Sequence, residues 1–172
     1  MESKTIDGVK DRVSTLDLEP IKFKLVKENG YSRDDVEVLD KWYRRFLFLT
    51  FKYPTRAIVV SEPIDQYWHQ HILDTHKYAE DCQMVFGQFL HHFPYFGLRG
   101  DEDQRALRAA YQATLELMRE EFGETPDEEL RVLGTNAADA ELASLCSDCS
   151  GALAFEDSLF NRERPRLDAV MT

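Results

Sequence analysis

All five histidines of this 172-residue chain fall within one short stretch, between positions 69 and 92. Histidine is the side chain that most often binds transition metals or carries protons near neutral pH. Two or three histidines together with a carboxylate form a frequent ligand set for Zn²⁺ and for non-haem iron. The clustering therefore predicts metal or acid–base chemistry in this part of the chain. The five residues are His69, His71, His76, His91 and His92.

Helical spacing separates these histidines into two strips. On a regular α-helix His69 and His71 lie about 200° apart around the axis, so they flank the core face on opposite sides and cannot easily bind the same ion. Asp65 lies four residues before His69, on one strip. His76 is near them in angle but shares an exposed side with charged neighbours, and we expect it to be solvated. The other strip contains His71, Thr75, Tyr78 and Cys82.

Either strip needs ligands from another part of the chain, and His91 and His92 are the remaining imidazoles. We predict a site for iron, zinc or copper built from Asp65 and His69, or from His71, and completed by His91 or His92. Two neighbouring sites, one on each strip, are the alternative. Neighbours in an extended segment point in opposite directions, so His91 and His92 need not both bind.

Three residues are candidates for a catalytic role. Asp65 can bind the metal or orient an imidazole N–H. Tyr78 can donate a hydrogen bond to a ligand or carry a proton, although an aromatic ring beside a core face usually serves packing. Cys82 falls on the core face, where cysteine usually behaves as a small apolar residue, and it becomes a ligand or nucleophile only if it meets His71. Asp81 is expected to be an exposed, solvated charge.

A CxxC pair, Cys146 and Cys149, lies near the end of the chain. Such a pair is half of a zinc site or a redox pair. No second CxxC occurs in the sequence, so the pair is either incidental or belongs to an arm that lends thiolates to a site. The total of three cysteines is odd, which argues against a disulfide framework.

The charge balance excludes several classes of function. The chain has 32 acidic and 21 basic residues, which gives a net charge of −11. Such a surface repels nucleic acids and anionic membranes. The N-terminal residues are too charged for a signal peptide, and the longest apolar-rich run, residues 46–51, is too short to cross a bilayer. We therefore expect a reduced, cytoplasmic protein that binds no nucleic acid and no membrane.

The apolar pattern predicts an all-α fold, a single compact domain of four or five helices. We expect a flexible leader over residues 1–16, a helical domain over residues 17–134 and a C-terminal arm with partial disorder over residues 135–172. Ser32 followed by Asp35 resembles a capping box, and the helix that it starts ends before Pro54.

The remaining helices are expected on both sides of the histidines. Residues 18–30 alternate like a strand, but a proline near their start and a final glycine favour a helix. Further helices are expected over residues 101–122 and 125–134, and the irregular HHFPYFG segment at residues 91–97 should fold back over the central helix. That central helix spans residues 64–86, with a core face of Ile64, Trp68, Ile72, Thr75, Ala79, Cys82 and Phe86.

A long motif covers residues 65–97: D-x-x-W-H-x-H, then a tyrosine and an Asp-Cys pair, then HHFPYFG. In this motif the chain resembles the bacterial forms of the glycine-rich domain-containing protein-like family, over roughly residues 19–122. The resemblance implies no particular reaction, but it marks Asp65, Trp68, His69, His71, Tyr78, Asp81, Cys82, Gly87, His91, His92, Pro94 and Gly97. The glycine-rich region itself is absent, since only 8 glycines are scattered along the chain. His76 stands where relatives carry arginine, which supports its exclusion from the site.

Two functional hypotheses follow. The first is a histidine-cluster metalloprotein, a metal-dependent enzyme that acts on a small molecule or peptide. Iron or copper would make it an oxidoreductase, which we favour over a hydrolase, and zinc would indicate hydrolysis or a structural role. The alternative is a non-catalytic protein-interaction module, in which the histidines and aromatic residues form a helical core and a groove for a partner.

Overall fold

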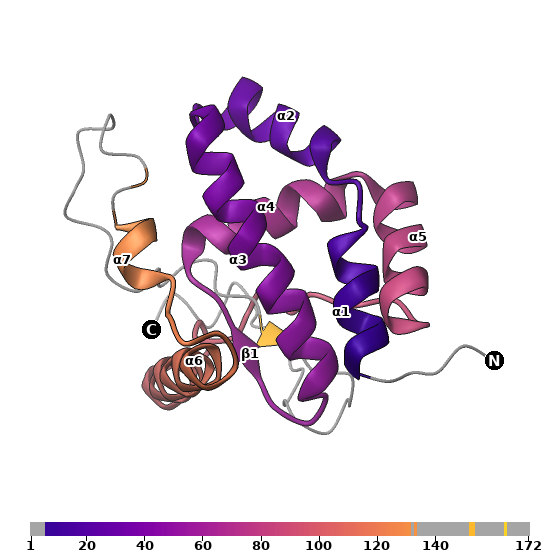
Figure 1. Cartoon of the computed structure of the whole chain (residues 1–172). Coiled ribbons are helices and arrows are strands. Elements are labelled where there is room, and N and C mark those ends of the chain that lie inside the picture. The colour runs from indigo at the N-terminus through magenta and orange to yellow at the C-terminus, as the bar shows by residue number, and fades with distance from the viewer. Residues whose placement is uncertain (1–5, 132, 134–151, 154–163, 165–172) are drawn as a thin grey trace.

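Helix α3 (Arg33–Lys52) lies at the centre of the fold (Figure 1). The computed structural model describes residues 6–131, 133, 152–153 and 164. Two-residue strands β1 (Ile58–Val59) and β2 (Ala152–Leu153) pair antiparallel, with Ile58 opposite Leu153. The other helices in the described part are α1 (Ile6–Ser14), α2 (Glu19–Asn29), α4 (Glu62–Leu73), α5 (Thr75–Phe86), α6 (Asp101–Phe122) and α7 (Asp127–Leu130). The prediction of an all-α fold is confirmed.

The predicted capping box is present at the start of α3. The Ser32 hydroxyl accepts a hydrogen bond from the Asp35 N–H at 3.1 Å, and the Asp35 carboxylate accepts one from the Ser32 N–H at 2.9 Å. Two N–H groups that the helix cannot pair internally are thereby satisfied. The helix then buries its apolar stripe and ends at Tyr53, before Pro54. The buried aromatic rings of this stripe are Trp42, Tyr43, Phe46 and Phe48.

Residues 18–30, for which strand and helix were both considered, contain helix α2. Ile21 and Leu25, four residues apart, are fully buried, whereas Phe23 between them is 69% exposed. This is the spacing of a helix face. Pro20 occupies the first turn, and Gly30 closes the helix with φ of 78°, a left-handed conformation that favours glycine.

The structure has seven helices in its described residues, more than the four or five expected. One of the additions is α1, which packs against α3 and α5 and buries Val9 and Val13. The guanidinium of Arg44 donates to the carbonyls of Val13 at 2.5 Å and Leu16 at 3.0 Å, which fixes the end of α1 to α3. A packed helix over Ile6–Ser14 therefore replaces the flexible leader predicted there. The predicted C-terminal arm lies almost wholly outside the described residues, as does the predicted end of the last helix at Gly134.

The second addition arises because the expected central helix is two helices. The chain breaks at Asp74, with φ of −85° and ψ of 74°, and the Asp74 side chain accepts a hydrogen bond from the Lys77 N–H at the start of α5. The continuous core face predicted over residues 64–86 is therefore wrong in its middle: Thr75 and Ala79 are exposed. The predicted core face is confirmed at both ends, where Ile64, Trp68, Cys82 and Phe86 are all buried.

The irregular segment after α5 packs back over the helices, as predicted. Phe93 and Phe96 are each 7% exposed and pack with Val59 of β1 and Leu107 of α6 in a small second core. Gly97 has φ of 94°, and a Cβ at this position would come within 2.5 Å of the Leu107 side chain. The close approach of this segment to α6 thus requires glycine.

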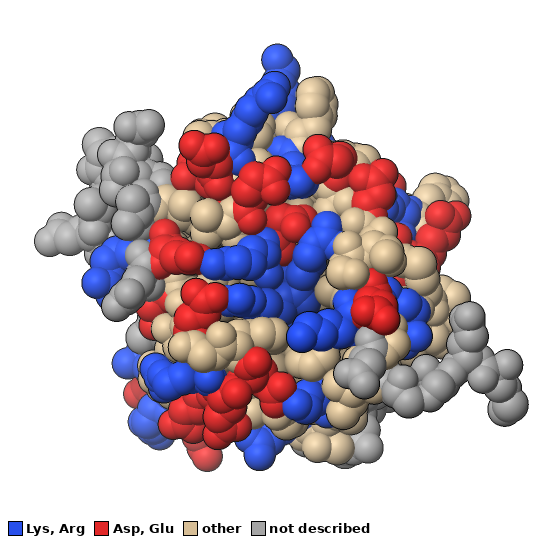
Figure 2. All heavy atoms as spheres, viewed as in Figure 1, with Lys and Arg blue, Asp and Glu red and all other residues tan. Residues whose placement is uncertain are grey.

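Ion pairs hold the C-terminal helices against α3. Figure 2 shows a basic band over α3 bordered by acidic side chains. Lys41 lies 2.6 Å from the carboxylate of Glu129, and Arg45 lies 2.7 Å from that of Glu124. The positive charges of Lys41 and Arg45 on α3 are therefore neutralised within the fold. None of the described helices is long and apolar enough to cross a membrane.

Candidate metal centre

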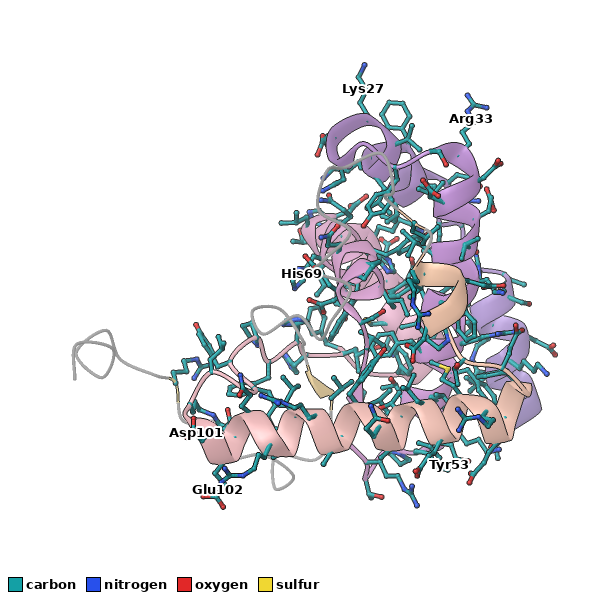
Figure 3. The ribbon with its side chains drawn as sticks, turned by 90° about the vertical axis from the view of Figure 1, so that its left-hand side faces the viewer. Lys27, Arg33, Tyr53, His69, Asp101 and Glu102 are labelled. Atoms are coloured by element: carbon teal, nitrogen blue, oxygen red, sulfur yellow. The ribbon has the colours of Figure 1, made fainter. Side chains whose placement is uncertain are left out.

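Helix α4 places two of the candidate ligands on adjacent turns. Asp65 and His69 are four residues apart, so their side chains lie on the same face of the helix. The Asp65 side chain is completely buried, whereas that of His69 is 37% exposed. The pair therefore spans the boundary between core and solvent, and Figure 3 shows His69 at the outer edge of the helix.

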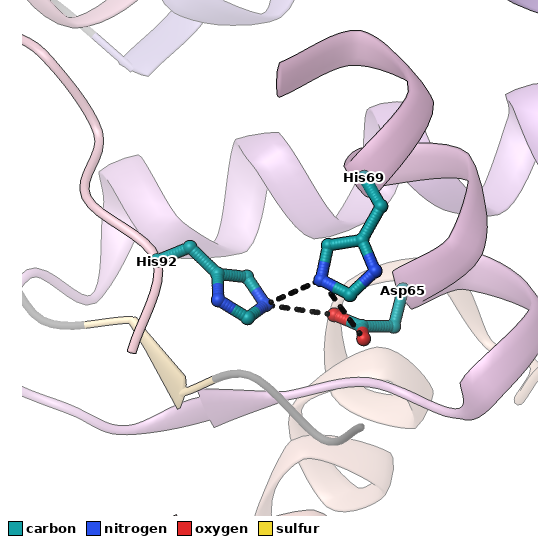
Figure 4. A group of neighbouring side chains, drawn as sticks. All are labelled: Asp65, His69 and His92. Atoms are coloured by element: carbon teal, nitrogen blue, oxygen red, sulfur yellow. Dashed lines mark hydrogen bonds and ion pairs between the residues drawn. The ribbon is translucent and has the colours of Figure 1, made fainter. Parts of the chain in front are cut away.

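The third candidate ligand, His92, comes from the irregular segment after α5. Its Nε2 atom lies 3.1 Å from Nε2 of His69 and 3.2 Å from Oδ1 of Asp65, while His69 Nε2 lies 3.5 Å from Oδ2 (Figure 4). The three residues offer ligand atoms that all lie within 4.8 Å of one another. We call Asp65, His69 and His92 the open cluster.

The hydrogen bonds within the open cluster leave some of its acceptor atoms without a donor. Only one hydrogen atom fits between the two Nε2 atoms, so one ring directs a lone pair toward its neighbours. The Asp65 Oδ2 atom is buried and has no hydrogen-bond partner. A buried polar atom without a partner is unfavourable, and more so when it carries charge. The cluster thus presents an excess of acceptors at one point.

The spacing of the open cluster fits a bound transition metal. With metal–nitrogen bonds of about 2.1 Å, two ligand nitrogens stand about 3.4 Å apart in a tetrahedral site and about 3.0 Å apart in an octahedral one. The 3.1 Å between the two histidines falls in this range. Two imidazole nitrogens and one carboxylate oxygen are also the donor set that zinc and non-haem iron take.

The protonation state of His69 also favours metal binding. Burial lowers the pKa of its imidazole below the ordinary 6.5, the Asp65 carboxylate opposes this effect, and His92 adds to it. The ring is therefore neutral at neutral pH. A neutral imidazole is the form that binds metals.

His71 lies in a different set of contacts. Its Nδ1 atom is 2.9 Å from the Tyr43 hydroxyl and its Nε2 atom is 2.9 Å from Oδ2 of Asp81, which also binds Lys77 at 2.9 Å. The assignment that satisfies every group has Tyr43 donating to Nδ1 and Nε2–H donating to Asp81. No ring nitrogen of His71 is left for a metal. We call Tyr43, His71, Asp81 and Lys77 the closed cluster.

Asp81 is therefore not the solvated charge that the sequence predicted. Its side chain is 13% exposed. Burial by itself would raise the pKa of this carboxyl, but the hydrogen bonds from His71 and Lys77 outweigh burial, so the pKa lies below its ordinary 3.8. The charge is held inside the closed cluster.

The remaining histidines stand apart from both clusters. His91 is exposed and packs against the ring of Phe89, with 4.9 Å between ring centroids. His76 is exposed on α5, as expected from its charged neighbours. Of the two adjacent histidines, the structure brings only His92 to the metal-ligating group found among the described residues.

The other two catalytic candidates, Tyr78 and Cys82, are both buried. The Tyr78 hydroxyl donates to the Leu90 carbonyl at 2.6 Å and accepts from Trp68 Nε1–H at 3.0 Å. Cys82 is 3% exposed, and burial raises the pKa of its thiol, so it remains protonated at neutral pH. The pair Cys146 and Cys149 lies outside the described residues.

Two aromatic residues that contact the cluster histidines were not identified from the sequence as functional. Trp68 was assigned to the core, yet its ring also packs on His92 with 4.4 Å between centroids. Tyr43 belongs to the apolar stripe of α3, yet its hydroxyl binds His71. The available signal was the presence of a hydroxyl or an indole N–H in a stripe that phenylalanine would fill, since buried Tyr and Trp usually find a partner.

The comparisons with known proteins add a family but no activity. A model of the family described as UCP032817-like matches residues 12–143, well over half of the chain. No curated protein and no solved structure matches. The matched region contains all residues of both clusters. The resemblance to the glycine-rich domain-containing protein-like family is not tested by this match and stays a prediction.

Proposed function

The chain belongs to the UCP032817-like family, and we propose that it binds one divalent transition-metal ion through Asp65, His69 and His92. The open positions of this ion would receive a small molecule or a peptide, so that the protein works as a metal-dependent enzyme. Iron, zinc and copper are all compatible with the donor set.

The observation that carries this proposal is the Oδ2 atom of Asp65. It is buried without a hydrogen-bond partner beside the Nε2 atoms of two histidines. Removing one partner of a buried charge costs several kcal/mol, roughly 3–5, so a fold that keeps a buried carboxylate in this state gains from a bound cation. A metal ion would satisfy the carboxylate and both imidazoles at once.

The number of ligands supports a reactive centre over a structural one. Structural zinc sites usually have four protein ligands, whereas catalytic sites have three and an open position. The described residues supply three, and the exposure of His69 gives access from solvent. A metal ion held in this way would polarise a bound substrate or activate water or dioxygen. The protein's own contribution is to orient the ligands and bury Asp65.

Reconstitution tests the proposal. Protein prepared without a histidine tag is loaded separately with Fe²⁺, Zn²⁺ and Cu²⁺, desalted, and its metal content measured. We expect a ratio approaching one ion per chain for at least one metal, and His69→Ala should lose it while His76→Ala, changed at an exposed histidine, keeps it. A content below about 0.2 per chain for all three metals would sink the proposal, since a true site binds tightly.

One control concerns the CxxC pair, which is half of a zinc site and can contribute to metal uptake. The double variant Cys146→Ser, Cys149→Ser should retain the ion. If it loses the metal and His69→Ala keeps it, the binding site is not the open cluster.

A second candidate function, a protein-interaction module, is favoured by two exposed apolar side chains. Phe23 on α2 is 69% exposed and Leu73 at the end of α4 is 65% exposed, and these helices pack against each other. Large exposed apolar side chains are candidate contacts for a protein partner. Folded protein that takes up no metal in the experiment above would favour this second function.

A further inference from the structure

The chain that carries His92 lies outside the helices, so its position depends on contacts with neighbouring elements: a backbone bridge at Phe93 after it and side-chain contacts before it. Residues 88–92 follow the end of α5 and form no helix or strand. Asp65 and His69, in contrast, are held by the backbone hydrogen bonds of α4. The geometry of the open cluster is therefore set by whatever fixes His92 relative to α4.

One buried hydroxyl makes that connection. Tyr78, on α5, is 1% exposed. Its hydroxyl donates to the carbonyl of Leu90, two residues before His92, at 2.6 Å, and accepts from the indole N–H of Trp68 at 3.0 Å. Trp68 directly precedes His69 in α4.

The indole also touches the ligand itself. The ring of Trp68 packs on the ring of His92, with 4.4 Å between centroids and 53° between planes. The Tyr78 hydroxyl thus holds both the main chain before His92 and the aromatic surface on which His92 rests. These two hydrogen bonds are buried, where such bonds are strong and directional.

We propose that Tyr78 is a positioning residue of the metal centre, whose hydroxyl holds His92 where its Nε2 atom meets Asp65 and His69. The inference rests on the proposed metal site and adds the residue that sets its geometry. Loss of the hydroxyl removes the hydrogen-bond partner that it provides to the Leu90 carbonyl and to the Trp68 N–H, which is costly at buried groups. Because the helices are held by their own packing, the irregular segment shifts to relieve this, and His92 shifts with it.

Tyr67 offers a matched control. It lies on α4, is completely buried, and its hydroxyl donates to Oδ1 of Asp40 at 2.9 Å. Tyr67→Phe therefore removes a buried tyrosine hydroxyl, as Tyr78→Phe does, but its hydrogen-bond partner belongs to α3 and not to the His92 segment.

Cobalt(II) is the probe, because its visible absorption reports ligand geometry. We expect Tyr78→Phe to weaken Co²⁺ binding about 10- to 100-fold, the usual effect of removing a group that orients a metal ligand, and to change the Co²⁺ spectrum. Tyr67→Phe should match the wild-type protein in both respects. The metal-free unfolding midpoints of the two variants show whether their losses of stability are comparable.

A second measurement separates positioning from general loss of structure. In a His92→Ala background, titrated with enough Co²⁺ to saturate the weakened two-ligand site, Tyr78→Phe should cause no further loss of Co²⁺ affinity, because no His92 ring remains to be positioned. An equal fold-loss in both backgrounds would overturn the proposal. If Tyr78→Phe is unfolded in buffer, all variants are compared in trimethylamine N-oxide, which favours the compact state.

The possible failures are distinct. If the wild-type chain binds no Co²⁺, Fe²⁺, Zn²⁺ or Cu²⁺, the metal site itself is wrong. If the wild-type chain binds Co²⁺ and Tyr78→Phe binds it within twofold and with the same spectrum, the metal site stands and the positioning role of Tyr78 is refuted.

Discussion

The open and closed clusters both start from a histidine on α4 and a carboxylate, yet their atoms end in opposite states. In the closed cluster each ring nitrogen of His71 has one protein partner at 2.9 Å. In the open cluster the Nε2 atoms of His69 and His92 face each other, and Oδ2 of Asp65 has no hydrogen-bond partner. The closed cluster is complete as it stands, and the open cluster would be completed by the proposed cation.

The contrast teaches that burial by itself does not assign a role to a histidine. Among the three histidines of the two clusters, His71 is the most buried, with a side chain that is 2% exposed, and both of its ring nitrogens already have protein partners. His69 is the most exposed, at 37%, and it belongs to the group with unused acceptors. What separates the two roles is whether the protein provides a donor for each acceptor.

The largest expected difference between the clusters is in metal binding. His92→Ala removes one of three ligands and should lower metal content from near one per chain to below about 0.2. His71→Gln, which keeps an amide near Asp81, should bind metal with wild-type stoichiometry. Equal losses in the two variants, measured by metal analysis after desalting, would show that the clusters are not separate.

The closed cluster should matter more for the stability of the metal-free protein. His71→Ala leaves the Tyr43 hydroxyl without its acceptor, removes one of the two partners of Asp81 Oδ2 and opens a cavity, so it should cost about 2–4 kcal/mol in the free energy of unfolding. His91→Ala, at an exposed position, should change it by less than about 0.5 kcal/mol. Urea unfolding of metal-free protein measures both, and a His71→Ala loss no larger than that of His91→Ala would contradict the closed cluster.

The two carboxylates should respond to amide substitution with opposite signs. Asp81→Asn removes a charge paired with Lys77 and should cost about 1–3 kcal/mol. Asp65→Asn removes a buried charge with an unpaired oxygen and can donate to His69, so the metal-free protein should be unchanged or up to about 1 kcal/mol more stable.

The same two variants, Asp65→Asn and Asp81→Asn, should also differ in metal binding. Asp65→Asn should weaken binding of the preferred metal, whereas Asp81→Asn should not. If Asp65→Asn destabilises the metal-free protein as much as Asp81→Asn does, the carboxylate of Asp65 is already satisfied without a cation, and the main support for the proposed site fails.

Local geometry was sufficient to predict part of the open cluster. The four-residue spacing of Asp65 and His69 needs only a helix to bring them together, and the opposite placement of His71 follows from the same rule. The choice between His91 and His92 could not be predicted, because it depends on the path of an irregular segment. Contacts distant in sequence, such as Tyr78 with Leu90, set that path.

Two features of the fold escaped prediction for similar reasons. The break between α4 and α5 has no proline or glycine to mark it, and its one local signal is Asp74, a residue type that caps helices. Helix α1 has only nine residues, and so short a helix is stable only through packing. The four-residue spacing of Val9 and Val13 was visible, but the surface of α3 and α5 that buries them was not.

The smallest expected difference between the clusters is in the pH dependence of stability. The pKa of His69 is lowered from 6.5 in the folded protein, so the unfolded chain binds a proton more readily as the pH falls below about 6.5, and stability declines. The pKa of Asp81 is lowered from 3.8, so its stabilising contribution is present above that value and is lost only as the pH falls below it. In metal-free protein, His69→Gln should therefore flatten the decline between about pH 7 and 5, whereas Asp81→Asn should change the acid limb below about pH 4. Thermal unfolding across this range tests the assignment, and a His69→Gln profile parallel to that of the wild type would contradict it.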